Sequence, residues 1–359
     1  MRRTISAVTG LILAGGIIGA AAPRAAMAAA CSSAQGQAYI TDGRYKLAIR
    51  EFTCLVEAQP TEIEGYRGRI EAELLLGRFV DAVSDYARIN AYVLPVHPDA
   101  EQLIVDGYEA RLNAAPDDIA ALTGESGVRW WFFHYATALR LLDDLLEYRP
   151  NDLYGNLFRG SSRLLHGSNR AGGVADLERA LAMAPDNASV HFLVADAYTY
   201  GAEPDPLRAF NEATTALNAG LDTPRIHAIL ATSYVAFGNM AAAAVEYAKH
   251  IELVTTQLVV TTPLGERSSM SAGLVPGRTY EIPLPATAGA TISIATSSKD
   301  FYDTILVLLA PDGTPILGSD DYKSYFAGFS WVAPATGTYR VRVTSFESVN
   351  TGTLVVTRN

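Results

Sequence analysis

One ten-residue pattern occurs twice in the sequence and sets the strongest limit on the fold. The stretches GRYKLAIREF, beginning at Gly43, and GRFVDAVSDY, beginning at Gly77, start 34 residues apart. Both place a glycine, an arginine, an aromatic residue, an alanine and a second aromatic residue at the same offsets. A repeat of this length accommodates two antiparallel helices joined by a turn. Because one such unit cannot bury its apolar face alone, we expect further copies stacked along the chain.

The residue types within the pattern fit a helical hairpin. Ala48 and Ala82 are small, as required where two helices cross closely. Phe52 and Tyr86 follow four residues later, on the same helix face, and would fill the gap to the next helix. The two glycines would lie in the turns, and Pro60 would end a second helix because it lacks the backbone N–H.

Further copies follow, and together they resemble a tetratricopeptide-repeat array. The clearest is IHAILATSYVAFGNMAAAAVEYAKH, which begins at Ile226. The resemblance covers residues 31–257, with five clear hairpins and one degenerate one, and it implies an α-solenoid. Residues 97–128 do not fit one period. There we expect NAAPDDIAALTGESG to be a helix end followed by an irregular insert.

The last part of the chain changes period. After about Val254, segments such as TYEIPL, ATISIATS and TYRVRVTSF alternate apolar and polar residues and are separated by turn signals such as PDG and VPG. Short strands at this spacing predict an antiparallel sandwich or jelly roll. With Asp303 leading a strand and Gly337-Thr338-Tyr339 opening another, residues 263–359 resemble the bacterial pre-peptidase C-terminal domain.

The predicted fold is therefore multidomain α + β. An α-solenoid of tetratricopeptide-type helical hairpins over 31–257 would be followed by an antiparallel β-sandwich over 258–359. The final helix, ending near Val254, has no solvating helix after it. Because repeat arrays need their end faces covered, we expect the sandwich to pack against that helix.

The first 30 residues have the layout of a secretory signal peptide. A basic MRR precedes an apolar stretch rich in small residues, and Ala28-x-Ala30 offers a cleavage site. Export to the periplasm, the medium or the cell surface would place Cys31 and Cys54 in an oxidising compartment, where a disulfide is expected. Lipidation of Cys31 at a new N-terminus is the alternative.

The charge excludes one class of partner. Without Arg2, Arg3 and Arg24 the formal net charge of −10 becomes −13, and most of it lies in the helical part. Nucleic acid binding needs a basic surface, so no nucleic acid partner is expected. Beyond the signal peptide no run approaches the ~18–20 apolar residues of a membrane helix, so no membrane span is expected after cleavage.

No motif in the sequence points to catalysis. There is no HExxH, no cysteine–histidine metal spacing, no phosphate-binding glycine loop and no GxSxG. The six histidines are spread about one per repeat, and we interpret His191 and His227 as packing residues. The predicted function is a non-catalytic scaffold that binds a protein or peptide in the groove of the array.

Two phenylalanines mark the expected groove. Phe158 and Phe192 occupy the same place in successive repeats and have polar neighbours. Such a pair suits an apolar anchor of a bound peptide, although packing between repeats would need the same residues. The predicted groove residues are Phe158, Ser162, Phe192, Asp196, Tyr200, Arg67 and Glu71.

The densest aromatic cluster is RWWFFHYATALR, which contains Trp130, Trp131, Phe132, Phe133 and Tyr135. Two interpretations stay open. The cluster is either a buried helix clamped by the irregular insert or an exposed shelf for a ligand, since aromatic residues are enriched at binding hot spots.

The resemblance of the last domain implies two further properties. Some members of that family bind calcium or matrix polymers, and Asp300, Asp303, Asp320 and Asp321 are the candidate calcium ligands here. Asp303 and Asp320 would otherwise cap turns. The alternative function is thus a carbohydrate- or matrix-binding surface protein, in which the sandwich binds the polymer and the repeats act as a spacer.

Overall fold

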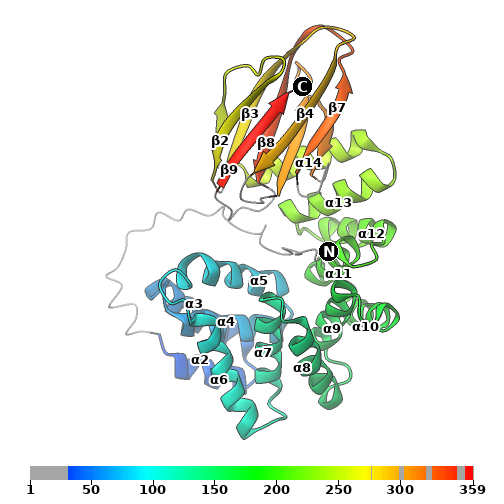
Figure 1. The fold of residues 1–359 in the computed structure, drawn as a ribbon. Helices are drawn as coiled ribbons and strands as arrows, with labels where there is room; N and C mark the ends of the chain where they lie inside the picture. The colour runs from blue at the N-terminus through cyan, green and yellow to red at the C-terminus, as the bar shows by residue number, and fades with distance from the viewer. Residues whose placement is uncertain (1–30, 276, 299–302, 321–325, 346–351, 359) are drawn as a thin grey trace. The chain divides into compact units, whose positions relative to one another are not determined.

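The computed structural model describes residues 31–275, 277–298, 303–320, 326–345 and 352–358. The expected signal peptide, residues 1–30, lies outside these ranges and stays a prediction. Along the chain the helices precede the strands (Figure 1). The helices are α2 (Ser33–Thr41), α3 (Tyr45–Ala58), α4 (Ile63–Leu76), α5 (Phe79–Arg88) with its π-helical extension η1 (Ile89–Val93), α6 (Ala100–Ala114), α7 (Ile119–Trp131), α8 (Tyr135–Tyr148), α9 (Leu153–His166), α10 (Arg170–Met183), α11 (Ala188–Tyr200), α12 (Pro206–Asn218), α13 (Pro224–Ala236) and α14 (Met240–Val254).

The chain divides into two compact units. One contains α2 to α11 and the end of α12, and the other contains the start of α12, α13, α14 and the strands. Consecutive helices pack as hairpins: α2 with α3, α4 with α5, α7 with α8, α9 with α10, and α13 with α14. We number them first, second, third, fourth and sixth, because α11 and α12 follow as the fifth pair. The expected hairpins of tetratricopeptide type are confirmed.

A small residue recurs where the second helix of each pair crosses the first. It is the fourth residue of that helix in every case, and its side chain is buried. Only a side chain of this size lets two helix backbones approach closely. The positions are Ala48, Ala82, Ala138, Gly173, Ala209 and Ala243.

Several turns between the helices of a hairpin contain a left-handed residue. Gly43 and Gly77 have φ of 69° and 79°, as expected for the residue that ends a helix in the left-handed region. The third hairpin lacks this glycine, and Phe133 adopts a φ of 62° there instead. A bulky side chain in this conformation is strained, so the third turn differs from the other turns.

The expectation of an irregular insert within residues 97–128 is wrong. The segment contains an additional helix, α6, and the start of α7 at Ile119. Asp118 caps the N-terminus of α7, because its side chain accepts the N–H of Ala121 at 3.0 Å. The glycines of this segment permit close packing: a Cβ on Gly124 would lie 2.3 Å from the ring of Tyr108. Glycine here marks close approach of a neighbouring ring and does not break the helix.

The strands form the two sheets of a sandwich. The first sheet has the order β1-β3-β8-β5-β6 and the second the order β2-β9-β4-β7. All neighbouring strands are antiparallel except β1 and β3, which are parallel. The strands are β1 (Gln257–Val260), β2 (Ser268–Leu274), β3 (Arg278–Ala286), β4 (Thr291–Ser298), β5 (Thr304–Leu309), β6 (Pro315–Ser319), β7 (Gly328–Val332), β8 (Gly337–Ser345) and β9 (Gly352–Arg358).

The core between the two sheets explains why most strands were predictable. Inward-facing side chains such as Ile282, Ile294, Leu306 and Val341 are buried and alternate with more exposed ones on β3, β4 and β8. Strands β2 and β6 have no such signal, since SSMSAGL and PILGS consist largely of serine, glycine and proline.

Helix α14 packs on strands β5 and β6, within one compact unit. Tyr247 of α14 is buried and donates from its hydroxyl to Asp320 Oδ1 at 2.7 Å. Gly318 of β6 leaves room for this ring, because a Cβ there would lie 2.6 Å from Tyr247 Cδ2. The expectation that the sandwich covers the last helix is confirmed. In the described part of the chain, no helix combines the length and the apolarity that crossing a bilayer requires.

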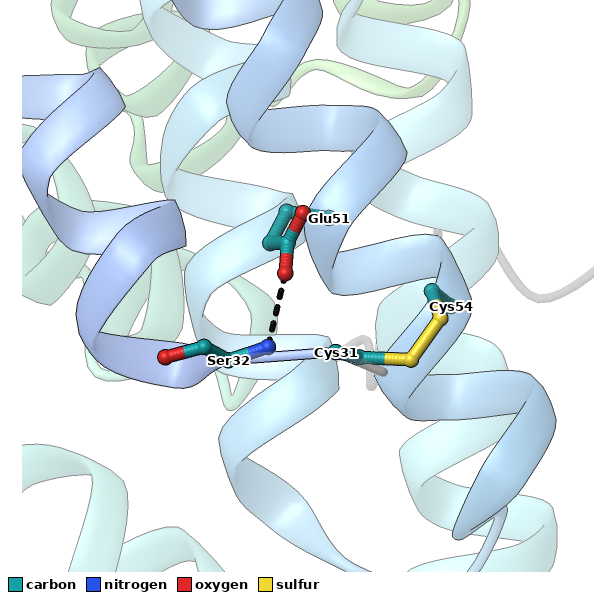
Figure 2. Close-up of a disulfide and its surroundings, with 4 residues drawn as sticks. All are labelled: Cys31, Ser32, Glu51 and Cys54. Atoms are coloured by element: carbon teal, nitrogen blue, oxygen red, sulfur yellow. Dashed lines mark hydrogen bonds between the residues drawn. A yellow bond between two sulfur atoms is a disulfide. The ribbon is translucent and has the colours of Figure 1, made fainter. Parts of the chain in front are cut away.

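A disulfide fastens the start of the first hairpin. Cys31 and Cys54 are bonded, with 5.8 Å between their Cα atoms (Figure 2). The backbone N–H of Ser32 also donates to Glu51 Oε1 at 2.7 Å, and Ser32 caps α2 by accepting the N–H of Gln35. The start of the first helix is thus attached to the second helix of its hairpin by a covalent bond and by a hydrogen bond to Glu51.

Replacing both cysteines by serine should destabilise the chain by roughly 3 kcal/mol, because the open loop gains conformational entropy on unfolding. Denaturant unfolding of the oxidised protein and of the double variant measures the difference. Intact-mass analysis of the protein purified under oxidising conditions should show the loss of two hydrogens, and two free thiols would contradict the pairing.

Gly318→Val should destabilise the unit that contains α14 and the sandwich by about 1–3 kcal/mol, because the new side chain meets the ring of Tyr247. Gly273→Val on β2 is the matched control, since nothing lies within 4 Å of a Cβ there. Equal melting temperatures for the two variants would show that the packing of α14 on β6 does not stabilise the protein.

Candidate functional site

A buried arginine in the second hairpin and a half-buried one in the fourth connect the two helices of these hairpins. Arg69, the seventh residue of α4, donates from Nη2 to Oδ1 of Asp85, the seventh residue of α5, at 2.7 Å. Arg159, the seventh residue of α9, donates to both oxygens of Asp176, the seventh residue of α10, at 2.8 Å. Bidentate arginine–carboxylate pairs of this kind are strong and geometrically specific.

Each of these arginines also reaches back to the preceding helix. Arg69 donates to Thr53 Oγ1 on α3 at 3.2 Å, and Arg159 donates to Asp143 Oδ1 on α8 at 2.9 Å. Although burial acts to raise it, hydrogen bonds from Arg159 and Arg179 lower the pKa of Asp176. One guanidinium therefore lies among three helices and closes the space between them.

The third hairpin reverses this arrangement. The seventh residue of α7 is Glu125, where the second and fourth hairpins have arginine. The seventh residue of α8 is Leu141, where those two hairpins have aspartate. In the other second helices the seventh residue is always acidic: Glu51, Asp85, Asp176, Glu212 and Glu246. No guanidinium spans the two helices of this hairpin at the equivalent position.

A cleft of about 350 Å³ opens at this position in the third hairpin. It lies within one compact unit and is formed by α6, α7 and α8. Its volume falls in the range of small-ligand pockets, ~300–1,000 Å³. The lining residues are Glu109, Leu112, Asn113, Pro116, Leu122, Glu125, Arg140, Leu141 and Asp144.

Glu125 is the most buried carboxylate of the cleft, with 2% of its surface exposed. Its Oε1 accepts one long hydrogen bond, 3.4 Å, from Arg129 Nε, and within the described chain its Oε2 accepts none. Burial raises the pKa of Glu125, and the nearby Arg129 opposes that rise only in part. Arg129 also donates to Glu109 Oε1 at 3.1 Å. The cleft thus contains a buried carboxyl group, Glu125, with few hydrogen bonds and little positive charge to balance it.

Helix α6 is held against the array by one arginine. Arg111 donates from Nη1 to Glu71 on α4 at 3.0 Å and pairs with Asp118, the cap of α7, at 3.0 Å. Burial raises the pKa of Glu71, and Arg111 counteracts this effect. Glu71 was predicted to line the groove, but its side chain lies in this buried contact. It positions the helix that forms one wall of the cleft.

The two predicted groove phenylalanines lie in the interior. Phe158 is 3% exposed and Phe192 is 1% exposed. The ring of Phe79, the first residue of α5, lies 5.6 Å from that of Phe158 and 6.3 Å from that of Tyr154. The chain's own Phe79 therefore occupies the place beside Phe158 where a peptide side chain was expected, and a ligand would not find these rings on the surface.

The remaining predicted groove residues are dispersed. Ser162 and Asp196 are buried, and Tyr200 and Arg67 are half-buried. The structure brings none of them to the cleft of the third hairpin. Whether they contact a partner stays a prediction.

The aromatic cluster spans the end of α7, a turn and the start of α8, so it is not the single helix clamped by an insert that the first interpretation described. Trp130 and Trp131 are buried, and Phe132 and Tyr135 are half-buried. Trp130 lies 5.2 Å from Phe158, and Trp131 stacks on Tyr86 at 5.3 Å between ring centroids. Phe133 is the exception, because the strained turn leaves half of its surface exposed. The cluster is a packing element between hairpins.

The two histidines interpreted as packing residues are both buried. His191 contacts the carbonyl of Pro185 at 2.8 Å. His227 lies between Glu246 and Asp222, with nitrogen–oxygen distances of 2.6 and 2.9 Å. Burial acts to lower the pKa of His227, but the two carboxylates outweigh it and the pKa is raised. The acid at the seventh position of α14 is therefore paired with His227.

The candidate calcium ligands are only partly described. Asp300 and Asp321 lie outside the described residues, and Asp320 accepts the hydroxyl of Tyr247. Among the residues that the structure does describe, no three acidic, histidine or cysteine side chains converge on a metal-sized site. Calcium binding by the sandwich stays a prediction.

The cleft residues were missed because they carry no motif. Glu125 is recognisable only by counting from the start of α7, which places it in register with Arg69 and Arg159. That start lies in the segment that was expected to be irregular, so the register could not be set from the sequence.

Glu73 is a second buried acid, one turn from Arg69 on α4. Its Oε2 has no hydrogen-bond partner within the described chain. Burial, with the charge of Asp85 adding to it and Arg69 opposing it, raises the pKa of Glu73 to about 8. The carboxyl is thus mostly protonated at neutral pH.

Comparison with known proteins gives similar folds only. No family model matches the chain, and no curated protein matches it. Among solved structures, the chain is similar to MamA from Desulfovibrio magneticus, with 18% identity, coverage of 44% of this chain and 88% of that one, and a TM-score of 0.38. A tetratricopeptide repeat protein from Parabacteroides merdae matches with 14% identity, 64% and 78% coverage and a TM-score of 0.38. The pre-peptidase C-terminal domain of a Bacillus anthracis collagenase matches with 11% identity, 28% and 94% coverage and a TM-score of 0.25. These scores are low, so the assignment of the hairpins rests on their own geometry.

Glu73→Gln should change the pH dependence of stability. Below about pH 4.5 the carboxyl is protonated in both the folded and the unfolded states, so the variant and the parent should differ little. Between about pH 4.5 and pH 8 the unfolded parent ionises while the folded parent stays protonated. The parent should therefore lose roughly 5 kcal/mol relative to the variant across this window, and nothing more above it.

Denaturant unfolding from pH 4 to pH 9 measures this difference. Glu64→Gln, an exposed acid on the same helix, is the control and should track the parent. Parallel profiles for Glu73→Gln and the parent would show that the Glu73 carboxyl titrates at its ordinary pKa.

Proposed function

We propose that the chain is an exported, non-catalytic scaffold that binds a peptide segment of a partner protein in the cleft of the third hairpin. The observation that carries this proposal is the cleft itself. The second and fourth hairpins fill the equivalent space with an arginine paired to a buried aspartate, whereas the third leaves it open.

The composition of the cleft supports a peptide ligand. Leu112, Leu122 and Leu141 supply apolar surface, while carboxylates and Arg140 supply polar contacts at its margins. Ligand sites commonly combine apolar walls with a few such polar groups. The disulfide of the first hairpin is compatible with export. The alternative, polymer binding by the sandwich, stays a prediction without a comparable supporting observation.

Panning a random peptide library on the purified full chain tests the proposal. Peptides should be enriched on the parent, and their binding should fall at least tenfold on Asn113→Trp, because Asn113 is exposed at the cleft and an indole there would obstruct it. Ser168→Trp, in the exposed turn between α9 and α10, adds the same side chain elsewhere and should bind like the parent. If no enriched peptide distinguishes Asn113→Trp from Ser168→Trp, the cleft is not the binding site and the proposal fails.

A further inference from the structure

Comparing the seventh residue of the first helix between hairpins shows which chemical group is absent from the open cleft. In the second and fourth hairpins the group between the helices is a guanidinium, supplied by Arg69 or Arg159. In the third hairpin, Glu125 stands at the position of those arginines. A carboxylate therefore faces the space that a guanidinium occupies in the second and fourth hairpins.

We infer that the cleft binds the guanidinium of an arginine side chain presented by the partner protein. This inference rests on the function proposed above and specifies the chemistry of the bound segment. The arginine of the partner would occupy the space that Arg69 and Arg159 fill within the chain, and Glu125 would be its principal acceptor.

The charges around the cleft favour a cation. Three of its lining residues are acids, Glu109, Glu125 and Asp144, and Arg140 is the one basic lining residue. Arg140 pairs with Asp144 at 3.5 Å, and both side chains are largely exposed, so this ion pair is weak and can be displaced. The lining thus has an excess of negative charge that a bound guanidinium would reduce.

Glu125 has the acceptor capacity that such a ligand needs. It is buried, its Oε2 accepts no hydrogen bond within the described chain, and its Oε1 accepts a single long one. Arg129 cannot fill the cleft, because it lies one turn along the same helix and is shared with Glu109. A planar guanidinium can donate to both oxygens of one carboxylate, which is the geometry of Arg159 on Asp176.

The apolar wall suits the rest of an arginine side chain. Leu122 and Leu141 are buried and Leu112 is half-buried beside the acids. Arginine methylenes pack along apolar surface while the charged end bonds to acceptors. Lysine lacks the second donor pair, so arginine is the better match.

A peptide pair tests the inference directly on the purified full chain. The probe is the acetylated and amidated pentapeptide Gly-Gly-Arg-Gly-Gly, and its control carries citrulline, which is neutral and of similar shape. Titration is followed by the NMR signals of methyl-labelled leucines. The arginine peptide should shift the cleft leucines saturably in the millimolar range, and the citrulline peptide should bind at least tenfold more weakly. Equal affinities for the two peptides, or no saturable shift with the arginine peptide, would overturn the inference.

Two variants locate the acceptor. Glu125→Gln should weaken binding of the arginine peptide about tenfold. Glu147→Gln, which removes the same charge from the exposed end of α8 outside the cleft, should change it less than twofold. A loss of the same size in both variants would show that the effect is general electrostatics and would contradict a specific site.

A double variant keeps the test decisive if Glu125→Gln does not fold. Glu125→Arg combined with Leu141→Asp rebuilds in the third hairpin the pair seen in the second and fourth. It should fold, with a melting temperature at or above that of the parent, and should no longer bind the arginine peptide. Retained binding would mean that the peptide lies elsewhere.

Library panning separates this inference from the proposed function. If peptides that depend on the cleft are selected but lack arginine, the inference fails and the scaffold function stands. If no selected peptide depends on the cleft, the scaffold function itself fails.

Discussion

The close crossing of two antiparallel helices is the constraint on which the helical part depends. A small residue at the fourth position of each second helix allows this approach and fixes the register of the pair. The seventh position lies one turn later on the same helix face and therefore also faces the first helix. That position is acidic in every second helix except α8. Where the acid is buried, as at Asp85 and Asp176, it requires a partner, because an unpaired buried acid is costly.

The chain meets this requirement differently from one hairpin to the next. In the second and fourth hairpins, Arg69 and Arg159 each pair with the aspartate at the seventh position of the second helix. In the sixth hairpin, His227 pairs with the glutamate at that position. Burying ion pairs contributes little net stability. We therefore interpret these pairs as determining how neighbouring helices are positioned relative to each other. In the third hairpin the acid is on the first helix and leucine is on the second, and the space between them stays open.

The hairpins could be predicted because their signals are local. Glycine turns and the small crossing residues follow from backbone geometry. Helix α7 was missed because Gly124 serves packing against Tyr108, a contact that the sequence does not reveal. Strand β6 was missed for a similar reason, since Gly318 accommodates Tyr247.

The groove was predicted less well than the fold. A repeating phenylalanine indicates that a position is apolar, but burial depends on what packs against it. Phe158 contacts Phe79, which lies on α5, two hairpins before it. The cleft residues depend on the register of helices whose starts were uncertain. Both failures arise from contacts between segments distant in sequence.

A crystal structure of the full chain with the arginine pentapeptide bears most directly on the claim that the third hairpin is left open for a guanidinium. The account predicts density for the guanidinium between α7 and α8, within hydrogen-bond distance of Glu125, with Arg140 turned away from Asp144. A peptide bound at another surface, or a cleft closed by the chain's own Arg140, would contradict it.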